Sequence, residues 1–301
     1  MARQTRAIIV HYGDRALTAR ALASIGRGSV RPGIIVLVDN GPEGMELQAA
    51  DYADAGAEVR VVQPGRNTGF AGGVRLGLRA SAPTDSQYVW LFNNDAEAEP
   101  DALAELLEAQ ARLGERALVS SLILDTDSHD IWFEYAVFLP WRLEGRHVPY
   151  RGSVKDDVVM DSSISWRSVR YLPGCSLLVP MAAFSEVGGL DDTFFMYGED
   201  VDMSLRAQRA GYRLAVARRS VVNHRASSGT GIAARERLMA ETSFRLTARY
   251  YPWLLPPAIL GGLLTGLKRG TGRRQPWQFT SRLGGYKDAL LRTHTRVPDL
   301  G

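Results

Sequence analysis

The sequence predicts an α/β protein in which a mainly parallel sheet is flanked by helices. Two observations support this class. Short apolar runs alternate with amphipathic stretches through the N-terminal half, as in doubly wound sheets with right-handed crossovers. Several of these runs also end abruptly in Asn and Asp. Because the carboxyl ends of parallel strands meet at one edge of a sheet, we expect a ligand site at that edge.

Composition is that of an ordinary globular protein. The 301 residues are 45% hydrophobic and 23% charged, which is enough to bury the core of one or two domains. The net charge is only +3, but basic residues concentrate near the C-terminus, at Lys268, Arg269, Arg273 and Arg274. This pattern favours an anionic surface over a nucleic-acid groove. A single cysteine and an N-terminus without an apolar signal region predict a cytoplasmic protein.

The first two strands are predicted at residues 6–12 and 33–39. Residues 6–12 form a β-branched run, and residues 16–25 follow with apolar side chains on one helical side. Residues 33–39 repeat the strand pattern and stop at Asp39, Asn40 and Gly41. A carboxylate is therefore expected at the sheet edge after the second strand.

A glycine-containing loop follows the third predicted strand, residues 58–63. It carries Arg66 and Asn67 and then Gly69, Gly72 and Gly73 at the start of a predicted helix. Such glycines either let a phosphate approach the helix N-terminus or allow the helix to pack tightly on a strand. The adjacent Arg66 favours an anionic ligand. The first strand lacks a following Gly-x-Gly-x-x-Gly motif, which argues against a dinucleotide-binding dehydrogenase.

The apolar run 88–92 is the predicted central strand. It ends in Asn93, Asn94 and Asp95, before a predicted helix at residues 100–113. A carboxylate at this position can hold a divalent cation that binds phosphate oxygens. The alternative is an Asn/Asp turn that leads into the helix.

After residue 113 the pattern of apolar and polar residues becomes less regular. A strand is predicted at 117–124, followed by an aromatic insert at 125–170 that either shapes a substrate cleft or packs on the sheet as a β-hairpin. Residues 171–180 are predicted as a strand in which Cys175 is an inert core thiol, and residues 181–187 as a short helix.

A second carboxylate cluster precedes a predicted helix at residues 201–210. Glu199, Asp200 and Asp202 exceed what helix capping needs, and mutual repulsion raises the pKa of neighbouring carboxyls. One of them is therefore a candidate general base. After the next strand, His224 is either structural or completes a cation site with Asp95.

Taken in order, these motifs resemble a known family. The segments are IIVHY, VDN, RNTGFAGG, NND, GEDVDMSLRAQRAGYR and VVNH, spread between residues 6 and 231. They are similar to the inverting glycosyltransferases of family 2, and especially to the bacterial rhamnosyltransferase-like branch. The resemblance implies a GT-A nucleotide-sugar-binding fold with a mixed, mainly parallel central sheet and a helical C-terminal extension.

The resemblance also implies roles for residues. Asp200 would be the catalytic base with Glu199 in support, and Asp95 with His224 would bind Mg or Mn. Asn93 stands where the family often has the first Asp of its motif, so weaker metal affinity is expected. The donor would contact the following positions: Val10, His11, Tyr12, Asp39, Asn40, Arg66, Asn67, Gly72, Gly73, Asn93, Asn94 and Asp95.

The implied domain division is a catalytic unit at 1–231, with a nucleotide-binding half (1–98) and an acceptor-binding half (99–231), and a helical region at 232–301. The implied reaction is metal-dependent, inverting transfer of one sugar, L-rhamnose from dTDP-L-rhamnose, to a cell-surface glycan or its lipid-linked precursor. The alternatives are a UDP-hexose donor, a nucleotidyltransferase and a non-catalytic sugar-nucleotide-binding subunit. A nucleotidyltransferase would need a glycine-rich, basic loop after the first strand, where this chain has only Gly13, Asp14 and Arg15.

The tail combines apolar and basic character. Residues 253–267 are apolar but shorter than a membrane span, and Pro256 and Pro257 interrupt them. With the basic run that follows, residues 249–274 are expected either to lie in a membrane interface, at the inner face of the cell membrane, or to pack on protein or across a homodimer.

Overall fold

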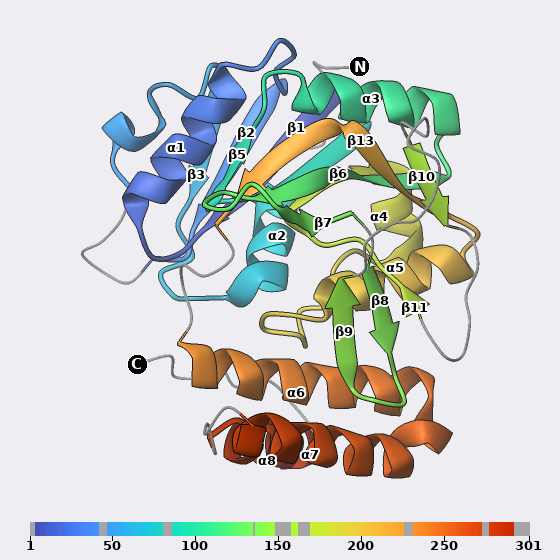
Figure 1. The fold of residues 1–301 in the computed structure, drawn as a ribbon. Coiled ribbons are helices and arrows are strands. Elements are labelled where there is room, and N and C mark those ends of the chain that lie inside the picture. Colours follow the sequence, from blue (N-terminus) through green and yellow to red (C-terminus); the bar gives the residue numbers. More distant parts are fainter. Residues whose placement is uncertain are drawn as a thin grey trace.

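The computed structural model describes residues 4–41, 47–80, 86–134, 136–147, 158–161, 169–225, 231–272 and 277–291. A large twisted sheet forms the centre of the molecule (Figure 1). Its strand order is β10 (Val158–Asp161), β13 (Arg213–His224), β6 (Ala117–Asp125), β12 (Ser176–Pro180), β4 (Tyr88–Asn93), β1 (Thr5–His11), β2 (Ile34–Asp39) and β3 (Glu58–Val62).

Most of these strands run in one direction, which confirms the mixed, mainly parallel sheet. Strands β3, β2, β1 and β4 are mutually parallel, and β6 and β13 are parallel to each other. Strand β12 lies between β4 and β6 and is antiparallel to both, so the two parallel groups share one direction. Short strands β5 (Ala96–Ala98) and β7 (Ile131–Phe133) pair antiparallel with β13 and β6.

Helices alternate with the first strands as the periodicity predicted. Helix α1 (Arg15–Gly26) begins where the Asp14 carboxylate accepts a hydrogen bond of 2.8 Å from the N–H of Ala16. Helix α2 (Gly69–Ala80) packs on β1 and β2, and α3 (Ala102–Leu113) packs on β6 and β13. Helix α4 (Met181–Val187) and helix α5 (Glu199–Arg209) follow β12 along the chain.

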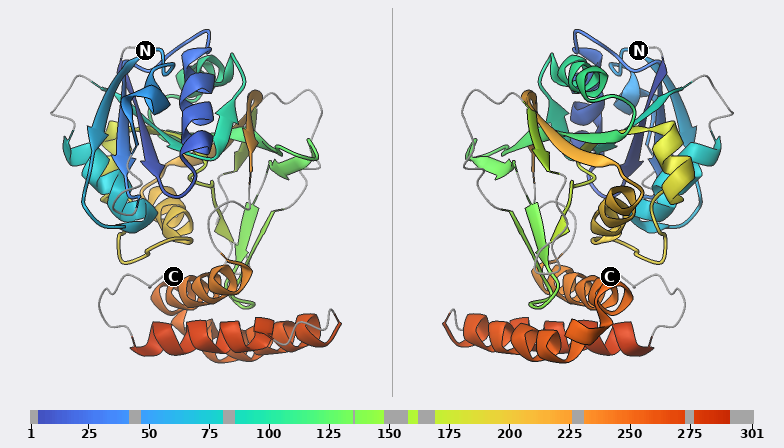
Figure 2. Two further views of the ribbon diagram at one scale, coloured as in Figure 1. Left: turned by 90° about the vertical axis from the view of Figure 1, so that its left-hand side faces the viewer. Right: turned by 90° about the vertical axis from the view of Figure 1, so that its right-hand side faces the viewer.

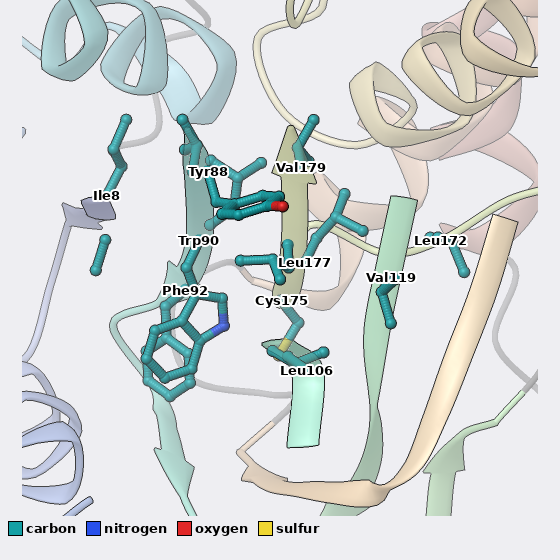
Figure 3. Packing of buried hydrophobic residues seen from close by; sticks show 14 of the residues in the cluster. Ile8, Tyr88, Trp90, Phe92, Leu106, Val119, Leu172, Cys175, Leu177 and Val179 are labelled. Atoms are coloured by element: carbon teal, nitrogen blue, oxygen red, sulfur yellow. The ribbon is translucent and has the colours of Figure 1, made fainter. Parts of the chain in front are cut away.

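The core around the central strand is apolar with one satisfied polar network. Tyr88, Trp90 and Phe92 of β4 pack beside residues of β12 (Figure 3), and the Trp90 and Phe92 rings lie 4.8 Å apart. The Trp90 indole donates to Ser176 Oγ at 3.0 Å, and the Ser121 hydroxyl lies 2.7 Å from those of Ser176 and Ser220. These polar groups are buried but paired, so their burial carries little penalty.

Two element predictions need correction. The strand predicted at 171–180 begins only at Ser176, because Pro173 offers no N–H to a ladder and Gly174 turns the chain. The helix predicted at 201–210 begins earlier, so that Glu199 and Asp200 form its first turn. Both corrections affect the acidic cluster, since the turn at Gly174 reaches Asp200.

The aromatic insert contains strands that are too short to give a recognisable alternating pattern in the sequence. Strands β8 (Ala136–Leu139) and β9 (Glu144–His147) form a hairpin that pairs with β11 (Val169–Arg170) in a separate three-stranded sheet. Phe138 packs with Leu246 and Tyr250 of the C-terminal helices rather than on the main sheet. Tyr135, residues 148–157 and residues 162–168 lie outside the described part of the chain.

The C-terminal region is a layer of helices below the sheet. Helix α6 (Ile232–Tyr250) lies between the sheet and the pair α7 (Leu255–Gly272) and α8 (Trp277–Leu291), with the short helix η3 (Pro252–Leu254) before α7 (Figures 1 and 2). An apolar cluster of Leu143, Ala240, Phe244, Ala258 and Tyr286 joins these helices to the β8–β9 hairpin. No helix in the described ranges has the length and apolar composition needed to cross a membrane.

One buried carboxylate ties α5 to α6. The Asp202 side chain has no exposed surface, and it accepts hydrogen bonds from Arg206, Arg249 and the Tyr250 hydroxyl. Arg206 also donates to the carbonyl oxygens of Val187 and Gly189. Asp202 is therefore a structural carboxylate rather than a member of a catalytic set.

We predict that Asp202→Asn destabilises the protein by about 2 kcal/mol. Breaking a buried ion pair typically costs about 3–5 kcal/mol, and the value here is lower because Arg249 and Arg206 are partly exposed. Chemical denaturation measures the change. Glu58→Gln, which breaks an exposed pair with Arg60, is the control and should change stability by less than about 0.5 kcal/mol. Equal effects of the two substitutions would contradict the assignment.

Candidate active site

The parallel register brings the predicted polar residues to one edge of the sheet. His11 is level with Asp39 in the β1–β2 pair, and Val10 is level with Asn93 in the β1–β4 pair. The end of β13 joins them, because His224 pairs with Ala96 of β5, next to Asp95. Residues far apart in the sequence thus form one polar edge, as strand topology predicted.

The carboxylate and amide after β2 hold neighbouring loops. The Asp39 carboxylate is buried and accepts hydrogen bonds from the N–H groups of Gly41 (3.0 Å) and Leu47 (2.9 Å). The Asn40 amide donates to the Gly69 carbonyl and accepts from the Thr68 hydroxyl, both at 3.0 Å. Asn40 thus links the end of β2 to the start of α2, and Asp39 holds Gly41 and Leu47 beside it.

A buried polar network lies below this edge. The Asn94 amide donates to the Thr18 hydroxyl at 3.1 Å and to the Tyr12 carbonyl at 3.3 Å, and Thr18 Oγ1 lies 2.7 Å from His11 Nδ1. The other ring nitrogen, Nε2, lies 4.0 Å from Asp39 Oδ1. Burial lowers the pKa of His11, so the ring is neutral near pH 7.

The loop that precedes α2 shows the packing role that was one of the two expectations for its glycines. Asn67 Oδ1 accepts from the N–H of Gly69 at 2.9 Å and starts the helix. A Cβ on Gly73 would come within 2.7 Å of Val10, whereas one on Gly72 would meet the Thr68 Cβ at 3.1 Å. Gly73 is therefore required by packing of α2 on β1. Arg66 is exposed, without an ion-pair partner among the described residues.

Asp95 and His224 face each other as the sequence suggested. His224 Nε2 lies 3.2 Å from Asp95 Oδ1 and 3.4 Å from the Asn93 amide nitrogen. The Trp132 ring packs edge-on against the His224 ring with centroids 4.8 Å apart and holds it in place. The buried Nδ1 of His224 has no hydrogen-bond partner in the described part of the chain.

This pair fits a divalent cation such as Mn²⁺ or Mg²⁺. The site offers a carboxylate, an imidazole nitrogen and an amide side chain close to one another, a ligand set that suits such ions. The remaining ligands would come from phosphate and water. Within the described ranges, no cluster of three or more His, Cys, Asp or Glu side chains forms a complete cage. Among the described residues, Asp95, His224 and Asn93 are therefore the candidate ligands at this position.

The acidic cluster sits on a strained turn. Tyr197 has φ +67° and Gly198 has φ +87°, immediately before α5. A left-handed conformation is costly for tyrosine, and such residues concentrate at functional sites. A Cβ on Gly198 would lie 3.1 Å from Thr242 of α6, so this turn is pressed against the C-terminal helices.

The two carboxyls on this turn differ from Asp202 in their surroundings. Burial raises the pKa of Asp200 to about 6, although the N–H groups of Val201 and Gly174 hydrogen bond to its carboxylate. Burial and the adjacent Asp200 charge raise the pKa of Glu199 well above its usual range, and its Oε2 has no hydrogen-bond partner among the described residues. Asp200 is thus ionised at neutral pH with its proton affinity raised, as a general base requires.

The turn at Gly174 and Cys175 connects the two halves of the site. The carbonyl of Cys175 accepts from the N–H of Asn93 at 2.9 Å, while the N–H of Gly174 donates to Asp200. The Asp95 charge also acts on the Cys175 thiol, whose pKa is raised mainly by burial, so the thiol is inert as predicted. The Asp95–His224 pair and the Asp200 carboxylate therefore flank one short turn.

Three contributors were missed by sequence reasoning. Thr18 was hidden in an amphipathic helix, and Gly174 in a run predicted to be a strand. Trp132 was noted only as part of an aromatic insert. Its contact with His224 follows from pairing of β7 with β6, a non-local event that no local pattern encodes. A polar residue on the apolar face of a helix is the one signal that could have revealed Thr18.

Solved structures with the same fold define the class of this protein. The structure of GalNAc-T7 with UDP, GalNAc and Mn²⁺ matches with a TM-score of 0.66 at 13% identity, over 96% of this chain and 56% of that chain. The mannosyltransferase PcManGT from Pyrobaculum calidifontis, with GDP-Man and Mn²⁺, matches with a TM-score of 0.59 at 14% identity, over 97% and 88%. The fold is therefore that of GT-A glycosyltransferases.

Sequence comparison gives the family. The model of glycosyl transferase family 2 matches residues 7–159, more than half of the chain, and that of glycosyl transferase family group 2 matches residues 88–265. The chain belongs to glycosyl transferase family 2 and is a glycosyltransferase.

Two curated relatives are rhamnosyltransferases. The N-acetylglucosaminyl-diphospho-decaprenol L-rhamnosyltransferase of Mycobacterium tuberculosis is 28% identical over 271 residues, covering 83% of this chain and 86% of that protein. Rhamnosyltransferase WbbL of Escherichia coli is 30% identical over 133 residues, covering 44% and 50%. The predicted similarity to rhamnosyltransferases is confirmed.

We predict that Glu199→Gln stabilises the protein at pH 8 and not near pH 4. The pKa of Glu199 is raised in the folded state above its unfolded value of about 4.3, so this carboxyl lowers stability increasingly as pH rises above that value. Thermal unfolding should show a Tm gain of a few degrees at pH 8, at about 2–4 °C per kcal/mol. A gain that is the same at both pH values would contradict this origin.

We further predict that Mn²⁺ binding depends on Asp95 and His224. Titration with Mn²⁺ in the presence of a nucleoside diphosphate should show at least about tenfold weaker binding for His224→Ala, with little change for the exposed control His129→Asn. Asn93→Asp should bind Mn²⁺ more tightly than the natural chain, because it adds a carboxylate beside the pair. Unchanged affinity in both His224→Ala and Asn93→Asp would exclude this site.

Proposed function

We propose that this glycosyltransferase moves one L-rhamnose from dTDP-L-rhamnose to a lipid-linked glycan precursor, with inversion at the anomeric carbon. The observation that carries the proposal is the pairing of a cation site, Asp95 with His224, and a buried base, Asp200, across the turn at Gly174 and Cys175. Rhamnose and the lipid-linked acceptor are inferred from the rhamnosyltransferase of M. tuberculosis, which aligns over most of both chains.

In this proposal each residue of the site has a defined task. Asp200 accepts the proton of the acceptor hydroxyl as that oxygen bonds to the anomeric carbon, and the nucleoside diphosphate leaves from the opposite face. Glu199, with its raised pKa, lies beside it and limits the negative charge at the base. A bound Mn²⁺ or Mg²⁺ would neutralise charge on the departing diphosphate.

The remaining residues would hold the donor. Asn94 holds the residues after β1, and Asn40 holds the loop after β3 against the end of β2. The exposed Arg66 of that loop would face the anionic nucleotide. The neutral His11 is a packed element of this edge rather than a charged ligand group. The division into donor and acceptor halves at residues 1–98 and 99–231 is part of the same proposal.

A donor panel tests the function directly. Purified protein is incubated with dTDP-L-rhamnose and with UDP-hexoses and GDP-hexoses, a polyprenyl-diphosphate-linked acceptor, and Mg²⁺ or Mn²⁺. We expect turnover of dTDP-L-rhamnose, loss with a chelator, and a product whose anomeric configuration, read by NMR, is inverted. Faster turnover of a UDP-hexose would reject rhamnose as the sugar, and retention of configuration would reject the mechanism.

The pH profile tests the base. Because Asp200 must be ionised, kcat should fall about tenfold per pH unit below pH 6 and be level above it. Asp200→Asn should lower kcat by about 10²–10⁴-fold and leave donor binding intact. As the control, Asp192→Asn changes a half-buried carboxylate outside the proposed base cluster and should keep the profile. A full-rate Asp200→Asn enzyme would remove Asp200 from the mechanism.

A further inference from the structure

The outer side of the C-terminal helices carries a concentrated apolar surface. Exposed large side chains lie along η3, α7 and α8, and elsewhere in the described ranges only Ile131 and Trp141 are comparable. We call this set the docking face; its members are Trp253, Leu260, Leu264, Leu267, Leu283, Leu290 and Leu291, each more than 40% exposed. An apolar surface this concentrated is characteristic of a binding surface.

The helix geometry explains why these side chains lie together. Leu260, Leu264 and Leu267 are spaced by four and three residues and form one stripe of α7. Gly285 and Tyr286 are buried on the side of α8 that faces α6. A Cβ on Gly285 would lie 2.3 Å from the carbonyl oxygen of Arg237 in α6. The leucines of α8 are therefore left on the side away from α6, and α7 and α8 form the outermost layer (Figures 1 and 2).

The excess of basic residues in this region favours an anionic partner. The sequence has no Asp or Glu between Glu241 and Asp288, whereas that stretch contains Lys268, Arg269, Arg273, Arg274 and Lys287. Arg282, in the same stretch, is buried and paired with Glu236, so it adds no charge to the surface. Asp288 itself is held by two hydrogen bonds of 2.6 and 3.0 Å from Arg237. Anionic phospholipids attract such a cationic, apolar surface, whereas a second copy of the chain would bring like charges together.

We propose that the docking face binds the surface of a bilayer that contains anionic phospholipid, with α7 and α8 lying in the interface plane. This proposal extends the proposed function and rests on it, because a lipid-linked acceptor is presented at the surface of a bilayer. Apolar side chains enter the acyl boundary while basic residues remain at the headgroups. Helix α6 then separates the membrane from the acidic turn at Glu199 and Gly198, which it contacts at Thr242.

Vesicle flotation tests the docking without donor or acceptor. The full chain is mixed with vesicles of phosphatidylglycerol and phosphatidylcholine, or of phosphatidylcholine alone. We expect binding to the anionic vesicles, weaker binding at high salt, and at least about tenfold weaker binding for the double variant Leu260→Gln with Leu264→Gln. Ile131→Gln, an equally exposed apolar residue on β7, is the matched control and should bind as the natural chain does.

Several results would overturn the docking proposal. They are equal vesicle binding by the double variant and the natural chain, no binding of the natural chain to anionic vesicles, or a dimer in size-exclusion chromatography that the double variant dissociates. Folding is checked by circular dichroism, which exposed substitutions should not change. If no donor is turned over while the double variant alone loses vesicle binding, the proposed function fails and the docking face stands.

Discussion

The ion-pair network around Asp202 is the interaction on which the rest of the structure depends. Its carboxylate is fully buried in the first turn of α5 and receives hydrogen bonds from Arg206 on the same helix and from Arg249 and Tyr250 on α6. Arg249 also binds Asp191 in the loop before α5, at 2.6 Å. One carboxylate therefore fixes α5, its preceding loop and the C-terminal layer relative to one another.

Three adjacent acids acquire three roles from their surroundings. Asp202 has cationic partners, so its charge is compensated where it is buried. Asp200 has mainly backbone N–H donors, which leave its pKa at about 6, and Glu199 has the Asp200 charge beside it and an unpaired oxygen. Residue type alone does not separate them; the identity of each hydrogen-bond donor does.

Much of the sheet and its edge could be predicted because the responsible signals are local. Apolar runs that stop at Asp39 and at Asn93 encode both the strands and the sheet edge at which these polar residues lie. The roles of Trp132, Gly174 and Asp202 could not be predicted, because each depends on pairing between distant segments. The first requires β7 to pair with β6, the second the approach of α5 to the turn at Gly174, and the third the return of α6 to α5. Periodicity reports which face of an element is buried but not what covers it.

The C-terminal layer stabilises the acidic turn, whose conformation is unfavourable by itself. Tyr197 and Gly198 are held at positive φ, and two carboxyls beside them have raised pKa values, so this segment is locally unfavourable. Such strain persists only when neighbouring contacts over-determine the conformation. Here the contacts are the Asp202 network and an apolar cluster that joins Phe138, Phe194 and Leu205 to Leu246 and Tyr250. Helix α6 therefore supports the turn that carries Glu199 and the proposed base Asp200, and it lies between this turn and the surface carried by α7 and α8.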